Sequence, residues 1–138
     1  MKRTNKLVAA AAVLAALTAV GTTVHAGTKI TFGTNIYRNP AGDGYAEGAM
    51  GSARNSYAGS PEYVWCYTGV NFAGAPMGAC AVYDANGQFA ICNGTGYYQF
   101  LAMASAGPDS YIQFWWDTTG KCTYITVANA SYNEPKLP

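Results

Sequence analysis

Residues 77–92 read Met-Gly-Ala-Cys-Ala-Val-Tyr-Asp-Ala-Asn-Gly-Gln-Phe-Ala-Ile-Cys, and this stretch decides the fold. Two short apolar segments flank the run from Asp84 to Gly87. Such a run is typical of a β-hairpin turn, because Asn and Gly tolerate the positive φ that tight turns require. A three-residue loop of residues 85–87 would place Cys80 directly opposite Cys92. The sequence therefore predicts a hairpin that carries one cysteine on each strand.

The four cysteines can pair in three ways, and the hairpin register discriminates among them. With the three-residue loop, we predict a Cys80–Cys92 disulfide, which leaves Cys66 to pair with Cys122. A two-residue turn would direct Cys80 and Cys92 to different faces, and it would favour Cys66–Cys80 with Cys92–Cys122. Either set leaves no free thiol.

Residues 1–26 have the pattern of a secretory signal peptide. A basic start precedes an apolar run over residues 7–20, and Ala26 suits a signal peptidase. We predict cleavage before Gly27 and a secreted or periplasmic protein, in a compartment where disulfides persist. The alternative is an uncleaved signal anchor. The sequence contains no other candidate membrane span.

Cleavage changes the charge of the chain and removes its one histidine. The eight basic residues lose Lys2, Arg3 and Lys6, which leaves five against seven acidic residues and a net charge of −2. A weakly acidic chain without a basic cluster is a poor nucleic-acid binder. The loss of His25 excludes imidazole-dependent nucleophiles and zinc sites that use histidine. We expect neither a cofactor nor a metal.

Periodicity predicts a mainly β protein, either a compact antiparallel sandwich or a strongly twisted sheet of five to seven short strands. Residues 27–43 form an N-terminal arm or short strand, residues 44–132 a single β-rich domain, and residues 133–138 a tail. Residues 44–60 are predicted to form a strand and then a loop, and residues 62–70 a strand. A second hairpin covers residues 109–131. One helix is predicted over residues 97–106, with Thr95 and Gly107 as caps and with Leu101, Ala104 and Phe100 packed on a sheet.

Aromatic side chains provide the main candidate for binding. The chain has eleven Tyr, three Trp and five Phe, and alternation places two groups on strand faces: Tyr63, Trp65 and Tyr67 on one strand, Tyr111 and Trp115 on another. If both groups lay exposed on one sheet, they would form a platform for a glycan or an envelope protein. The alternative is that one group lies in the core and the other forms an ordinary amphipathic cover.

Paired carboxylates are the catalytic arrangement that the mature chain could still form. Glycoside hydrolysis needs two carboxyl groups about 5 to 9.5 Å apart, and Glu47 and Glu62 are the acids least explained by turns. The alternative is that both are solvated strand residues. The run Asp84-Ala-Asn86-Gly87 has some likeness to a calcium loop, but a turn explains it more simply. We therefore expect a small non-catalytic binding protein; the alternative is a small carboxylate-dependent hydrolase.

Short motifs spread over most of the mature chain support export. They are Gly51-Ser-Ala-Arg-Asn-Ser56, Tyr63-x-x-Cys66, an Asp-Ala-x-Gly turn between Cys80 and Cys92, Gly107-Pro-Asp-Ser-Tyr-Ile112, Gly120-x-Cys122-Thr123 and Asn129-x-Ser-Tyr132. In these the chain resembles a group of small exported bacterial proteins of unassigned function. It departs from them at Cys80-Ala81, where the group has a Cys-Tyr pair. The resemblance implies export and disulfide bonds, and it implies no activity.

Overall fold

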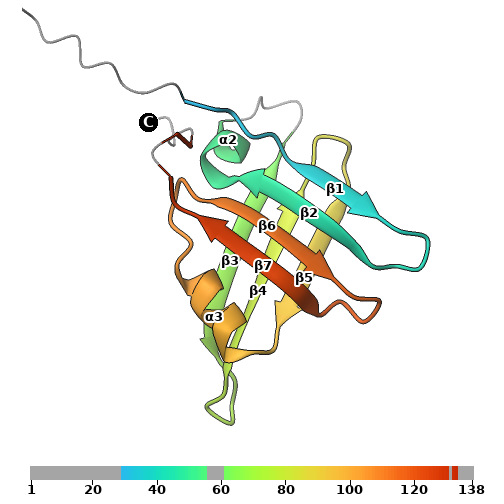
Figure 1. Cartoon of the computed structure of the whole chain (residues 1–138), viewed down its shortest axis with the longest axis vertical. Coiled ribbons are helices and arrows are strands. Elements are labelled where there is room, and N and C mark those ends of the chain that lie inside the picture. The colour runs from blue at the N-terminus through green and yellow to red at the C-terminus, as the bar shows by residue number, and fades with distance from the viewer. Residues whose placement is uncertain (1–28, 56–60, 131, 134–138) are drawn as a thin grey trace, which may run out of the picture.

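The structure, a computed structural model, describes residues 29–55, 61–130 and 132–133, and the predicted signal peptide lies outside them. Two antiparallel sheets pack as the layers of a sandwich (Figure 1). One has the order β1 (Asn35–Arg38), β2 (Gly44–Ala49), β6 (Tyr111–Trp116), β7 (Cys122–Ala128). The other has the order β3 (Tyr63–Val70), β4 (Pro76–Tyr83), β5 (Phe89–Gly94). The mainly β prediction is confirmed.

Two helices accompany the sheets in the described part of the chain. The short α2 (Met50–Arg54) follows β2 directly, where a loop was predicted, and α3 (Tyr97–Ala104) lies between β5 and β6 along the chain. Within the described ranges, neither helix has the length and apolar character that crossing a membrane requires.

One kind of turn closes all the hairpins of the two sheets. Each turn starts with Asn or Asp, whose side-chain oxygen accepts hydrogen bonds from backbone N–H groups of the loop, and each has Gly three residues later. These glycines have φ between 76° and 100°, a conformation that costs other residues energy. The turn pairs are Asn39 with Gly42, Asn71 with Gly74, Asp84 with Gly87, and Asp117 with Gly120. Local sequence therefore determines every connection between hairpin strands.

The predicted register of the central hairpin is confirmed, but the predicted disulfides are wrong. Cys80 lies opposite Cys92, as the three-residue loop requires. The bonds are nevertheless Cys66–Cys80, with Cα atoms 4.1 Å apart, and Cys92–Cys122, with Cα atoms 4.9 Å apart. The reason is that β4 is the central strand of its sheet, so Cys80 has a cysteine directly opposite it on each neighbouring strand.

The core lies between the two sheets. Ile112, Phe114 and Trp116 point inward from β6, and all three are buried. From the three-stranded sheet, the buried residues that join this core cluster are Val64, Cys80, Val82, Ala90 and Cys92. The Cys92–Cys122 bond therefore links the two sheets, whereas Cys66–Cys80 lies within one of them.

The predicted helix is confirmed, but its ends differ from the prediction. The N-cap is Gly96 and not Thr95; the side-chain oxygen of Gln99 accepts hydrogen bonds from the backbone N–H groups of both residues, at 3.2 and 2.9 Å. The last helical residue is Ala104 and the C-cap is Ser105, so the helix ends before Gly107. A glutamine within the first turn thus does the capping that we assigned to Thr95.

The face of α3 that packs on the sheet also differs from the prediction. Met103 is the buried residue of the helix, whereas Leu101 is exposed. Gly78 and Gly94, which lie opposite each other on β4 and β5, leave room for the Met103 side chain. A Cβ atom at Gly78 would lie 2.7 Å from the Met103 sulfur, and one at Gly94 would lie 2.8 Å from its terminal methyl. These glycines therefore allow α3 to close one end of the sandwich.

The N-terminal arm contributes a strand to the four-stranded sheet. We expected a strand around Ile30, but the strand is β1, and Ile30 makes only an isolated parallel bridge to Asn133. Asn133, the first residue of the predicted tail, is buried, and its side-chain amide donates to the carbonyl oxygens of Asp109 and Ala128. The remainder of the tail lies outside the described residues.

Candidate binding site

The two predicted aromatic groups lie on different sheets, so they do not form one platform. Tyr63, Trp65 and Tyr67 are on β3 of the three-stranded sheet, and Tyr111 and Trp115 are on β6 of the four-stranded sheet. Because the inner faces of the sheets share the core, their outer faces point away from each other. Each outer face is therefore a separate candidate surface.

An aromatic row crosses the whole outer face of the four-stranded sheet. Tyr37 lies opposite Tyr45, Tyr45 opposite Trp115, and Trp115 opposite Tyr124. The ring centroids of Tyr45 and Trp115 are 5.4 Å apart, and those of Trp115 and Tyr124 are 5.0 Å apart. Three interstrand spacings of about 4.8 Å make the row roughly 14 Å long. The exposed fractions are 60% for Tyr37, 36% for Trp115 and 54% for Tyr124.

A polar row runs beside the aromatic row on the same face. It consists of Asn35, Glu47, Gln113 and Thr126, which lie opposite one another across β1, β2, β6 and β7. Hydrogen bonds join the two rows: Asn35 donates to the Tyr45 hydroxyl at 2.9 Å, and Thr126 donates to the Tyr124 hydroxyl at 2.9 Å. These bonds orient the outer ends of two rings of the aromatic row.

The Glu47 carboxylate is the centre of this network. It accepts hydrogen bonds from the hydroxyls of Tyr45, at 3.0 Å, and Tyr111, and from the side-chain amide of Gln113, at 3.1 Å. Burial raises the pKa of Tyr111 well above its ordinary value, and the hydrogen bond to Glu47 raises it further. The same two causes raise the pKa of Tyr45. Both hydroxyls therefore remain protonated donors.

A β-bulge at the start of β7 places Tyr124 in the row. The register shifts between Trp115 and Trp116, so that Trp115 lies opposite Tyr124 while Trp116 lies opposite Cys122. Strict alternation would put Cys122 and Tyr124 on one face, because they are two residues apart. The extra residue, Thr123, instead directs Cys122 into the core and Tyr124 outward, which is a common effect of a bulge.

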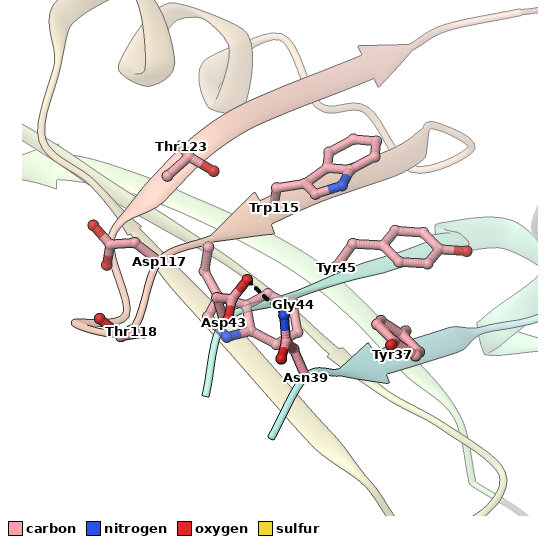
Figure 2. A pocket seen from close by; sticks show the side chains of 10 residues that line it. Tyr37, Asn39, Asp43, Gly44, Tyr45, Trp115, Asp117, Thr118 and Thr123 are labelled. Carbon is pink, nitrogen blue, oxygen red and sulfur yellow. Dashed lines mark hydrogen bonds between the residues drawn. The ribbon is translucent and has the colours of Figure 1, made fainter. Parts of the chain in front are cut away.

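Two shallow hollows lie on either side of Trp115. One, of about 450 Å³, is lined by the rings of Tyr37, Tyr45 and Trp115 and by the acidic side chains of Asp43 and Asp117 (Figure 2). We call it the acidic hollow. The other, of about 430 Å³, is lined by Trp115, Thr123 and Tyr124. Trp115 is therefore the residue that a ligand lying along the row would contact most.

Trp115 is the one predicted binding residue that belongs to the aromatic row. Tyr111 lies on the same face but is partly covered by Phe32, whose ring centroid is 5.0 Å away. The sequence interpretation did not select Tyr37, Tyr45 or Tyr124. For Tyr45 a signal existed, since it alternates with Ala46 and is followed two residues later by Glu47, but nothing local indicated that β2 pairs with β6.

The two candidate carboxylates have different surroundings. Glu47 lies on the outer face of the four-stranded sheet, while Glu62 precedes β3 and accepts hydrogen bonds from the backbone N–H and the hydroxyl of Thr34. Glu62 lines a separate hollow with Arg54. Oδ1 of Asp84, the first residue of the calcium-like run, accepts hydrogen bonds from the backbone N–H groups of Asn86 and Gln88. No group of three or more His, Cys, Asp or Glu side chains suited to a metal occurs in the described residues.

Comparison with known proteins found no matching family model, no matching curated protein and no matching solved structure.

Proposed function

We propose that this chain is a small non-catalytic binding protein of an extracytoplasmic compartment and that it holds a glycan along the aromatic row. The observation that carries this proposal is the aromatic row beside the polar row on one exposed sheet face. Sugar rings present C–H groups on their faces and hydroxyls at their edges. A sugar site therefore needs aromatic surface together with precisely placed polar groups.

Exposure of the row supports this function. Large aromatic side chains stabilise a fold when they are buried, so a continuous exposed set usually marks an interaction site. Tyr37 and Tyr124, at the two ends of the row, are each more than half exposed. A length of roughly 14 Å suits an extended oligosaccharide that crosses the strands.

The proposed location has separate support. Two disulfides are consistent with an oxidising compartment outside the cytoplasm. Residues 1–26 add the pattern of a secretory signal, and the resemblance to small exported bacterial proteins points the same way.

Affinity electrophoresis through gels that contain soluble cell-wall and storage polysaccharides tests the proposal. Migration of the mature protein should be retarded by at least one polysaccharide. Trp115→Ala should weaken that binding by at least about tenfold, since a central aromatic side chain commonly contributes about 2 kcal/mol or more.

A matched pair of tyrosines provides the control. Tyr124 in the row and Tyr63 on the opposite face are 54% and 55% exposed, so both substitutions remove a similar surface ring. Tyr124→Ala should weaken binding, and Tyr63→Ala should leave it unchanged. The proposal fails if the folded protein binds no glycan or if both variants lose binding equally.

A further inference from the structure

The acidic hollow combines aromatic rings with negative charge. In Figure 2 the rings of Tyr37, Tyr45 and Trp115 lie on one side, and Asp117 lies toward the other, at the turn between β6 and β7. Asp43 comes from the turn between β1 and β2. Two hairpin turns of the same type therefore bring two carboxylates to one side of the aromatic row, the side away from the polar row.

Each carboxylate keeps one oxygen that makes no hydrogen bond within the described part of the chain. Asn39 donates to Oδ2 of Asp43 at 3.2 Å, and Oδ1 of Asp117 accepts from Thr119 and Lys121. The other oxygen of each remains available to a ligand. The hydroxyl of Thr119 and the backbone of Lys121 hold the pKa of Asp117 below its ordinary value, so that this group stays ionised.

No basic side chain lines this hollow. Arg38, which follows Tyr37 on β1, lies 5.3 Å from the ring centroid of Trp116, a residue that also lines the hollow, but its guanidinium donates to the carbonyl oxygen of Phe89 in the other sheet. Lys121 lies near enough to favour ionisation of Asp117 but does not line the hollow. The hollow therefore combines aromatic rings and negative charge without a lining cation.

Such surroundings favour a cation. An ammonium group within about 6 Å of a Trp or Tyr ring centroid is attracted by the negative face of the ring, and carboxylates add direct charge attraction. A neutral sugar would gain stacking and hydrogen bonds to the carboxylates there, but no attraction between opposite charges. We propose that the acidic hollow binds a positively charged amino group, and hence that the glycan held along the row is a polymer of amino sugars with free amines. This inference rests on the proposed glycan function.

Isothermal titration calorimetry with three probes tests whether the acidic hollow binds an amino group. The probes are a glucosamine oligomer with free amines, the N-acetylated oligomer of the same length, and choline. At a pH where the amines are charged, the free-amine oligomer should bind about tenfold more tightly than the acetylated one. This preference should disappear in the double variant Asp43→Asn/Asp117→Asn. Asn preserves the turn at position 117, because the chain itself uses Asn39 and Asn71 at the same place in two other turns.

Asp109→Asn is a control for the loss of an acidic charge outside the hollow. It removes one negative charge beyond the opposite end of β6, so the preference should persist. The comparison of the two oligomers on the unmodified protein decides the question even if the double variant does not fold.

Equal binding of both oligomers would overturn the inference and leave the glycan function intact. If the protein binds other, neutral glycans but neither oligomer, the inference is also overturned and the glycan function again stays intact. Binding of choline without either oligomer would assign the hollow to a free ammonium ion and overturn the amino-sugar polymer. If no glycan of any kind binds, the proposed function fails together with the inference.

Discussion

The outer faces of the two sheets both carry exposed aromatic rings, but the neighbours of those rings differ. On the three-stranded sheet, Trp65 lies opposite Ala81 and Tyr67 opposite Ala79, and both alanines are fully buried. On the four-stranded sheet, the row containing Trp115 adjoins a polar row centred on Glu47. The first arrangement covers small residues and stabilises the fold, whereas the second presents rings together with hydrogen-bonding groups. Aromatic content alone therefore does not distinguish the two faces, whereas the residues beside the rings do.

The largest expected effect concerns the disulfide that joins the two sheets. Its loop spans 30 residues and that of Cys66–Cys80 spans 14. In the chain-entropy model, the replacement Cys92→Ala/Cys122→Ala should lower the free energy of unfolding by about 3.6 kcal/mol, against about 3.0 kcal/mol for Cys66→Ala/Cys80→Ala. Urea denaturation without reductant measures both. A larger loss for the bond within the sheet would contradict the prediction.

The next effect separates the roles of the two faces. Trp65→Ala should lower the free energy of unfolding by roughly 2 kcal/mol, because it uncovers the buried Ala81 and leaves Tyr67 without its stacked partner. Glycan binding by the folded variant should not change. Thermal denaturation of the variant tests the loss of stability, and affinity electrophoresis of the same preparation tests glycan binding. A variant with normal stability but weaker glycan binding would instead assign a binding role to the three-stranded face.

In the polar row, we expect a loss of stability similar to or smaller than that caused by Trp65→Ala. Glu47→Gln replaces one acceptor oxygen by an NH2 group and leaves one of three donors unpaired, so the free energy of unfolding should fall by about 1 to 2 kcal/mol. Asp43→Asn is the control on the same sheet, since it also removes one charge but affects a single side-chain hydrogen bond. Equal losses in urea denaturation would show that charge, and not the network, matters.

The smallest effect is a pH dependence that belongs to the four-stranded sheet. Because the pKa of Tyr111 is raised by burial and by Glu47, the folded protein holds this proton more tightly than the unfolded chain does. The stability that results is fully present below the ordinary tyrosine pKa of about 10 and is lost as the pH rises above it. In Tyr111→Phe, the free energy of unfolding should fall less steeply between pH 9 and pH 11, about one unit to either side of that ordinary value. Parallel curves for the two proteins would contradict this assignment.

Features determined by neighbouring residues could be predicted from the sequence. The turn from Asp84 to Gly87 contains both the acceptor side chain and the residue with positive φ, so the register of Cys80 against Cys92 was predictable. Alternation likewise placed Tyr63, Trp65 and Tyr67 together on one face of a strand, because side-chain direction in a strand has a period of two.

Features determined by distant segments could not be predicted in this way. The aromatic row depends on the pairing of β2 with β6, which brings Tyr45 to Trp115 across a long separation in sequence. It also depends on the bulge that turns Tyr124 outward, and no residue type near Thr123 announces that bulge. The choice of partner for Cys80 depends on where the strand with Cys122 docks. The site could therefore be predicted only as individual aromatic strands.

The position of Cys80 between two aligned cysteines also has a consequence for oxidative maturation. Once β3, β4 and β5 have paired, the Cys80 thiol can react with Cys66 on one side or with Cys92 on the other, because both lie opposite it. Oxidation toward Cys92 would leave Cys66 and Cys122 as the remaining thiols, on different sheets. Only docking of the four-stranded sheet brings Cys122 to Cys92 and distinguishes the native pairing from the alternative. The order of sheet docking and thiol oxidation thus controls the yield of native protein, and a thiol–disulfide exchange catalyst would correct molecules that oxidise first.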